Sequence, residues 1–223
     1  MSLIELKNLN KTFGSGDAFV QALDSVDLTI EYGAFAAVSG PSGSGKSTLL
    51  NIIGLLDQPT SGEYLFDGKL INYDDKKRIN QIRSYSLGFI FQNYNLLPVL
   101  TVLENVEMSA LQSISSNSER KKQAQLLLDQ VGLSDKLNSF PNQLSGGQQQ
   151  RVSVARSLMG SPKLVLADEP TANLDSSNTF KLIDLMKSLN QKLNISFLFS
   201  THDNRILDNV NNIINLTDGR VHK

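Results

Sequence analysis

The residues with the most evident chemistry lie in two segments, residues 40–48 and residues 144–175. The first segment, GPSGSGKST, fits the pattern G-x-x-x-x-G-K-[ST], whose backbone N–H groups wrap around a phosphate. Lys46 then reaches the terminal phosphates, and the hydroxyl of Ser47 can ligate Mg²⁺. An apolar run precedes the loop and a helical pattern follows it, so the segment predicts a nucleoside triphosphate site rather than a chance glycine-rich turn. The residues assigned to this site are Gly40, Pro41, Ser42, Gly43, Ser44, Gly45, Lys46, Ser47 and Thr48.

The second segment begins with a helix start that is open to an anion. Ser145 and Gln148 fit a capping box, and Gly146 and Gly147 leave backbone N–H groups uncovered. The helical pattern that follows is expected to end at the glycine, serine and proline of residues 160–162.

The same segment continues into a short apolar run, residues 164–167, that is typical of a buried parallel strand. The run finishes in two adjacent acids, Asp168 and Glu169. Asp168 stands where a P-loop NTPase places the carboxylate that holds Mg²⁺, and Glu169 is then placed to orient or deprotonate the attacking water. The alternative for Glu169 is a solvated acid at a strand end.

Three more side chains are candidates on position alone. His202 follows a buried strand at the end where α/β sheets place ligands, which favours a γ-phosphate contact over a structural role. Gln92 ends another apolar strand, and its side-chain carbonyl could complete the Mg²⁺ shell, although position leaves this evenly balanced. Phe13 is a single aromatic in a turn, which is more typical of a core residue than of a ligand.

The composition is that of an ordinary globular chain. The chain has 223 residues, 40% hydrophobic and 19% charged, which suffices for one sizeable α/β domain. A formal net charge of −1 provides no basic field for DNA, so no nucleic-acid partner is expected. The absence of cysteine excludes disulfides and cysteine-ligated zinc. Without a signal-peptide layout or a long apolar run, the chain is expected to be soluble and cytoplasmic.

The elements that must position these side chains follow an α/β pattern. Short apolar strands precede the phosphate-binding loop, Gln92, Asp168 and His202, while residues 60–70 predict a hairpin. Composition changes after Gln92, and from residue 93 to residue 131 the pattern is helical. We therefore expect an α/β core made of residues 1–91 and 161–223, interrupted by a helical insertion over residues 92–160.

Over essentially its whole length the chain resembles the ATP-binding cassette (ABC) ATPases. The family's seven elements occur in order: Phe13, the loop of residues 40–48, Gln92, LSGGQ at residues 144–148, the strand ending at Glu169, Asp175 and His202. LSGGQ is absent from other P-loop families. The resemblance implies a RecA-like core with an antiparallel β-subdomain and a helical subdomain. It also implies a head-to-tail homodimer that closes over two ATP molecules.

The resemblance also implies a role for each site residue. Phe13 stacks on adenine, although the family often has tyrosine there, and Gln92 links the metal to the helical part. Glu169 is the general base and His202 the γ-phosphate sensor. Ser145, Gly146, Gly147 and Gln148 contact the ATP of the other protomer, and Asp175 belongs to the same nucleotide site.

Within the family, the sequences of residues 89–106 and 168–175 are similar to those of ATPases from lipoprotein-releasing, macrolide-exporting and cell-division systems. The expected function is to drive an integral membrane subunit, carried on another chain, from the cytoplasmic face of the membrane. The apolar segment of residues 94–100 either docks that partner or packs the helical part. One rival function is that of a non-transport ABC ATPase of DNA repair or chromosome organisation, but such proteins have long coiled-coil or zinc insertions, and none is present here. The other rival is a P-loop kinase, which would explain residues 40–47 but not LSGGQ.

Overall fold

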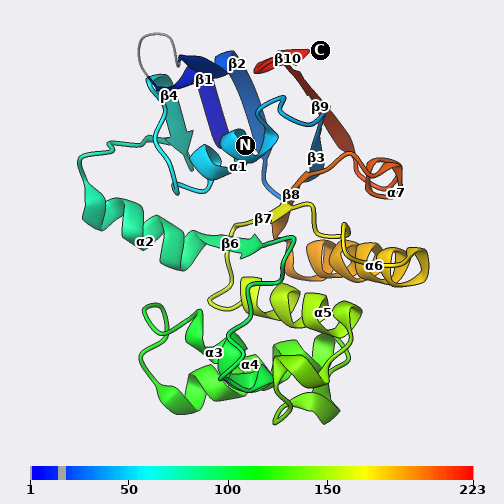
Figure 1. Ribbon diagram of the computed structural model, residues 1–223. Coiled ribbons are helices and arrows are strands. Elements are labelled where there is room, and N and C mark those ends of the chain that lie inside the picture. The colour runs from blue at the N-terminus through cyan, green and yellow to red at the C-terminus, as the bar shows by residue number, and fades with distance from the viewer. Residues whose placement is uncertain (1, 15–18, 223) are drawn as a thin grey trace.

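The structure is a computed structural model that describes residues 2–14 and 19–222, with two sheets above a group of helices (Figure 1). The larger sheet has the strand order β10-β9-β3-β8-β7-β6. Strands β9, β3, β8, β7 and β6 run parallel, and β10 pairs antiparallel with β9. Its strands are β3 (Phe35–Ser39), β6 (Leu87–Ile90), β7 (Leu164–Asp168), β8 (Ser196–Ser200), β9 (Asn212–Thr217) and β10 (Arg220–His222).

The central strands of this sheet are apolar on both faces. Since successive side chains on a strand point to opposite faces, Ala36 and Val38 enter one hydrophobic cluster, while Phe35 and Ala37 enter another. On the second face, the Phe35 ring meets the Phe199 ring edge-on at 4.9 Å between centroids. Burial on both faces explains why the strands appear in the sequence as continuous apolar runs rather than as an alternation.

The smaller sheet is antiparallel, with the order β2-β1-β4-β5. Its strands are β1 (Ser2–Phe13), β2 (Val20–Glu31), β4 (Ser61–Phe66) and β5 (Lys69–Leu70). Helix α1 (Lys46–Ile53) shares one hydrophobic cluster with both sheets, and the Tyr64 hydroxyl of β4 donates to the carbonyl of Ile53 at 2.8 Å. The predicted antiparallel β-subdomain is confirmed.

Between β6 and β7 the chain forms helices at the bottom of the molecule (Figure 1). They are α3 (Val102–Met108), α4 (Asn117–Gln130), the short 3₁₀ helices η2 (Ser134–Lys136) and η3 (Pro141–Gln143), and α5 (Gly146–Ser157). Their buried residues join the cluster beneath the parallel sheet, which α6 (Ser176–Leu193) and α7 (Asn204–Leu207) also line. The helical part therefore shares a core with the sheet, and its limits at residues 92–160 remain a prediction.

Three local predictions were wrong or incomplete. Helix α2 (Lys76–Ser86) was not predicted, because its eleven residues bury only Ile79 and Ile82 and give little periodicity. The helical pattern expected from residue 93 begins only at Val102: Tyr94 and Asn95 have φ of 61° and 50°, which no right-handed helix allows.

Helix α5 also ends at Ser157, before the predicted stop at residues 160–162. Within the described residues, no helix is both long enough and apolar enough to cross a bilayer.

Candidate active site

Three neighbouring strands bring the predicted site residues to one edge of the parallel sheet. β8 lies between β3 and β7, and Ser200 at its end pairs with both Val38 and Asp168. Because parallel strands end at the same edge, the loops that follow them meet there, where α/β sheets bind ligands. Together with the start of β2, these loops border a cavity of about 570 Å³, lined by Val20, Gln21, Ala22, Gly40, Pro41, Ser42, Gly43, Gly45, Lys46, Ser47, Thr48, Glu169, Ser200 and His202.

The loop of residues 40–47 needs its glycines. Gly45, the N-cap of α1, has φ of 101°, and a Cβ there would lie 2.4 Å from the carbonyl oxygen of Ala22. The Lys46 ammonium is buried and donates to the carbonyls of Gly40 and Pro41, each at 2.8 Å. The loop therefore holds a positive charge beside the start of a helix, where backbone N–H groups favour an anion.

The oxygen atoms of Ser47 and Asp168 fit the requirements of Mg²⁺. Ser47 Oγ donates to Asp168 Oδ1 at 3.3 Å. Neighbouring oxygens around an octahedral Mg²⁺ lie roughly 3 Å apart, since each is about 2.1 Å from the metal. No cluster of three or more histidine or acidic side chains suited to a metal occurs in the described part of the chain.

Glu169 adopts a strained backbone conformation at the cavity. Its φ is 45°, in the left-handed region that non-glycine residues seldom adopt. Its Oε1 lies 2.8 Å from Nδ1 of His202, and Oε2 accepts from the Thr201 hydroxyl at 3.4 Å. A carboxylate can only accept hydrogen bonds, so an ionised Glu169 requires the proton on Nδ1 of His202. Two residues predicted separately are thus in direct contact, with Glu169 mostly shielded from solvent and His202 exposed.

Ser200 is a cavity residue that was not assigned to the site from the sequence. Its hydroxyl is fully buried and has no hydrogen-bond partner among the described residues. A buried polar group of this kind needs a ligand or a water to satisfy it. Its place at the end of a buried strand, two residues before His202, is the signal that could have identified it.

Three predicted ligands lie away from the cavity. Gln92 is exposed beyond the end of β6, and its backbone carbonyl accepts from Nδ2 of Asn173 at 2.9 Å. Phe13 is 44% exposed at the end of β1, with the Lys11 ammonium 4.7 Å from its ring centroid. Asp175 caps α6 by accepting from the backbone N–H of Asn178. Hydrogen bonds from Asn178 hold the pKa of Asp175 below its ordinary value.

The LSGGQ segment also lies outside the cavity. Ser145 and Gln148 form the predicted capping box, with each side chain bonded to the backbone N–H of the other. Gly147 instead faces a separate cavity that Arg151 and Lys181 also line. The cavity of one chain therefore contains the phosphate loop, Glu169 and His202, but none of residues 144–148.

The carboxylate of Asp203, next to His202 in the sequence, links two loops of the site through hydrogen bonds. Asp203 accepts from Arg205 at 2.8 Å and from the Thr171 hydroxyl at 2.9 Å, and Thr171 belongs to the loop after Glu169. Burial opposes the ionisation of Asp203, but the hydrogen bonds from Arg205 and Thr171 outweigh it. The pKa of this carboxyl consequently lies below its ordinary value.

This arrangement predicts a pH-dependent stability. At pH 7, Asp203→Asn should lower the free energy of unfolding by about 2 kcal/mol, the worth of hydrogen bonds to a charged group. A depressed folded-state pKa stabilises the fold above the unfolded value of about 3.9, and this stabilisation is lost as the pH falls through the folded value. The difference between wild type and variant should therefore shrink below about pH 4.

Urea unfolding at several pH values measures this difference. Asp208→Asn, at the exposed end of α7, is the matched control and should change stability little at any pH. A loss for Asp203→Asn that stays constant down to pH 3 would show that the carboxylate charge is not responsible.

Comparison with known proteins places these features in context. The sequence profile described as "ABC transporter" matches residues 23–172. The chain is 45% identical to the ABC transporter ATP-binding protein MJ1508 of Methanocaldococcus jannaschii, over 98% of this chain and 97% of that protein. It is also 45% identical to the macrolide export ATP-binding/permease protein MacB of Mannheimia succiniciproducens, over 99% of this chain but 34% of that protein. The chain thus spans about a third of this relative's length.

Among solved structures, a dimer of the ATP-binding cassette MJ0796 in a post-hydrolysis state, bound to ADP and Pi, has a TM-score of 0.88. The two sequences are 44% identical, and the match covers 99% of this chain and 97% of the other.

Proposed function

The chain belongs to the ABC transporter family, and on this premise we propose how its residues hydrolyse ATP and what the chain drives. The fold is the P-loop cassette of that family, and the chain is an ATP-binding ATPase. The observation that carries the mechanism is the division of the predicted site: the phosphate loop shares a cavity with Glu169 and His202, whereas residues 144–148 lie elsewhere.

In this proposal the phosphate loop binds the triphosphate of ATP. The Lys46 ammonium exchanges its bonds to loop carbonyls for the terminal phosphate oxygens. Ser47 and Asp168 would hold Mg²⁺, which supplies charge neutralisation to the β- and γ-phosphates when it is bound. The buried hydroxyl of Ser200 gains an acceptor from the phosphate or from the attacking water. Phe13 is assigned to the adenine, and Gln92 reaches the metal only if the segment after β6 moves.

Glu169 acts as the general base. Its carboxylate takes a proton from water as the water oxygen bonds to the γ-phosphorus. The bond from that phosphorus to the β,γ-bridging oxygen breaks, giving ADP and phosphate. Nδ1 of His202 lies 2.8 Å from one oxygen of Glu169, and the exposed ring of His202 is assigned to the γ-phosphate.

Two chains are required to complete each site. Ser145, Gly146, Gly147 and Gln148 present the helix start of α5 to the ATP of a second chain, where its N–H groups meet the γ-phosphate. The dimeric assembly of the MJ0796 relative supports this arrangement. ATP binding closes the dimer, and hydrolysis reopens it.

We also propose that this motion drives a membrane partner in a system of the lipoprotein-release or macrolide- and peptide-export type, at the cytoplasmic face of the membrane. The MacB relatives, which are described as ATP-binding/permease proteins, support the assignment. A non-transport role in DNA repair has no comparable support.

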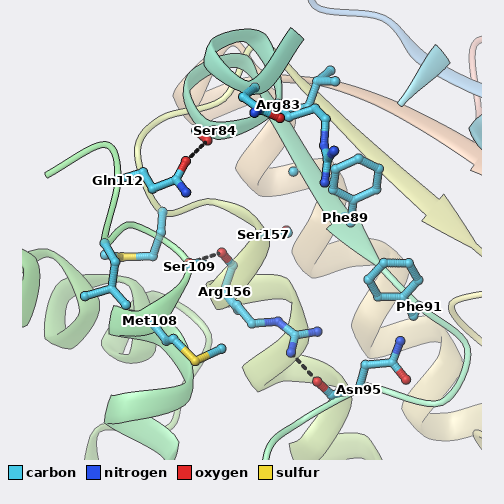
Figure 2. A pocket seen from close by; sticks show the side chains of 15 residues that line it. Arg83, Ser84, Phe89, Phe91, Asn95, Met108, Ser109, Gln112, Arg156 and Ser157 are labelled. Carbon is cyan, nitrogen blue, oxygen red and sulfur yellow. Dashed lines mark hydrogen bonds between the residues drawn. The ribbon is translucent and has the colours of Figure 1, made fainter. Parts of the chain in front are cut away.

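The partner's contact is assigned to a groove of about 570 Å³ between α2, β6, the end of α3 and α5 (Figure 2). Its walls include Phe89, Phe91 and Met108. Residues 94–100 form the apolar segment expected to dock the partner. Leu96 packs on the core, whereas Leu97 and Val99 are 40% and 79% exposed. Asn95 of the same segment lines the groove.

A metal-dependence assay tests the catalytic assignment. ATP hydrolysis should require Mg²⁺ and stop with EDTA, and Asp168→Asn should lower the rate by roughly 10²-fold or more, since an Asp-held Mg²⁺ neutralises transition-state charge. Asp184→Asn, an exposed acid on α6, is the control and should retain the wild-type rate. Undiminished hydrolysis in EDTA, or by Asp168→Asn, would refute the metal assignment.

A further inference from the structure

Lys11 on β1 is a charged side chain that is only 8% exposed and takes no part in the proposed hydrolysis. Its ammonium donates to Asp57 Oδ1 at 2.7 Å and to the carbonyl of Gln58 at 2.8 Å. A buried ammonium is costly unless it is paired and hydrogen-bonded, and these two partners meet that requirement. Both belong to the segment between α1 and β4, so the ammonium is held against the chain that follows α1.

The ammonium of Lys11 also lies over the ring of Phe13, two residues further along the same strand. It is 4.7 Å from the ring centroid, within the roughly 6 Å reach of a cation–π interaction. Phe13 is nevertheless 44% exposed, so the ring keeps surface that a second flat group can cover. Phe13 pairs with Val20, which lines the cavity of the phosphate loop, and the ring therefore lies at the edge of that cavity.

A planar base stacks best on a ring whose orientation is already fixed. An exposed phenylalanine otherwise turns about its side-chain torsions, and ordering it costs free energy each time a ligand binds. Phenylalanine has no polar atom by which its ring can be held. The attraction of its π face to the Lys11 ammonium supplies the directional contact instead, because the ammonium is itself fixed by Asp57 and Gln58.

We propose that Lys11 is a positioning residue for the nucleotide base: its ammonium holds the Phe13 ring from one face so that adenine stacks on the other. This inference rests on the proposed function, which assigns Phe13 to adenine, and adds the residue that orients the ring. Helix α1 begins at Lys46 and is followed by Asp57, so the base and the triphosphate are held in a fixed relation through the same helix.

Calorimetric titration of the full-length chain with ADP and with inorganic pyrophosphate, both in Mg²⁺, tests the proposal. Pyrophosphate has the phosphates of ADP without the base. Lys11→Met keeps a long unbranched side chain and removes the charge. It should raise the Kd of ADP about fivefold and leave the Kd of pyrophosphate unchanged, since the phosphate loop is intact. In ATPase assays, KM should rise by a similar factor while kcat stays at the wild-type value.

Two comparisons separate positioning from a general loosening of the fold. Lys11→Met in a chain that already carries Phe13→Leu should cause no further loss of ADP affinity, because no ring is left to hold. Lys7→Met, an exposed lysine of the same strand, is the matched control and should bind both ligands as the wild type does. If Lys11→Met does not fold, as judged by circular dichroism, Asp57→Asn decides: it releases the ammonium and should weaken ADP binding about twofold, again without affecting pyrophosphate.

Unchanged ADP binding by Lys11→Met, or an equal loss for ADP and pyrophosphate, would overturn the proposal. So would a full fivefold loss from Lys11→Met in the Phe13→Leu chain. A failure of the proposed function gives a different result. Phe13→Leu with wild-type affinity for ADP would contradict the assignment of Phe13 to adenine, whereas a loss for Phe13→Leu without one for Lys11→Met would contradict only this inference.

Discussion

Glu169→Gln should reduce ATP turnover by about 10²–10⁴-fold, the usual contribution of a general base, while ATP binding is retained. The variant should also form a dimer that is stable in ATP and dissociates when ATP is removed. Both results follow from the same cause, because closure requires ATP and reopening requires its hydrolysis.

The geometry around Glu169 makes this substitution selective. Glutamine keeps the size of the side chain, and its one carbonyl oxygen can still accept from Nδ1 of His202 while its NH₂ group donates to the Thr201 hydroxyl oxygen. The left-handed backbone at Glu169 is also unaffected, since only a side-chain oxygen is replaced. What is lost is the negative charge that takes the proton from water.

Steady-state ATPase assays and size-exclusion chromatography with and without ATP measure the two effects. Glu63→Gln, an exposed acid of β4, is the control and should hydrolyse ATP normally without accumulating a dimer. A Glu169→Gln chain that hydrolyses ATP at the wild-type rate would assign the base to another residue.

Much of the fold could be predicted from the sequence because its signals are local. Strands buried on both faces appear as apolar runs, and the loop of residues 40–47 requires glycine at positions such as Gly45, whose φ of 101° L side chains rarely adopt. The capping box of Ser145 and Gln148 is likewise contained within four residues. These parts agree with the structure.

The features that could not be predicted depend on contacts between distant segments. Residues 93–101 were expected to be helical. In the structure, Tyr94 and Asn95 instead form a turn, and their carbonyls accept hydrogen bonds from the guanidinium of Arg156, about sixty positions later. The contact between Glu169 and His202 follows from the place of β8 next to β7. Strand order is not recorded in any single run of residues, so both residues could be identified but not their hydrogen bond.

The central claim is that each active site combines the cavity of one chain with residues 144–148 of another. Lys46→Ala should inactivate a chain by removing the phosphate-binding ammonium, and Ser145→Arg by placing a large cation at the helix start of α5. Each variant alone should be inactive, because every site in its homodimer carries the defect.

The two variants should complement each other when they are mixed. In a mixed dimer, the Lys46 of the Ser145→Arg chain meets the intact Ser145 of the Lys46→Ala chain, which makes one complete site, while the other site carries both defects. Since half of the dimers in an equal mixture are mixed, activity should return to about a quarter of the wild-type rate.

A second mixture shows whether recovery depends on which chain supplies each residue. Lys46 and Glu169 line the same cavity, so a mixture of Lys46→Ala and Glu169→Gln chains contains no complete site and should remain inactive. Circular dichroism of each variant confirms folding, since loss of the Ser145 cap costs about 1 kcal/mol.

The ATPase rate of the equal mixture of Lys46→Ala and Ser145→Arg is thus the most direct measurement. The shared-site account predicts about a quarter of the wild-type rate, with no recovery in the Lys46→Ala and Glu169→Gln mixture. A rate no higher than that of either variant alone would contradict the account and show that each chain completes its own site.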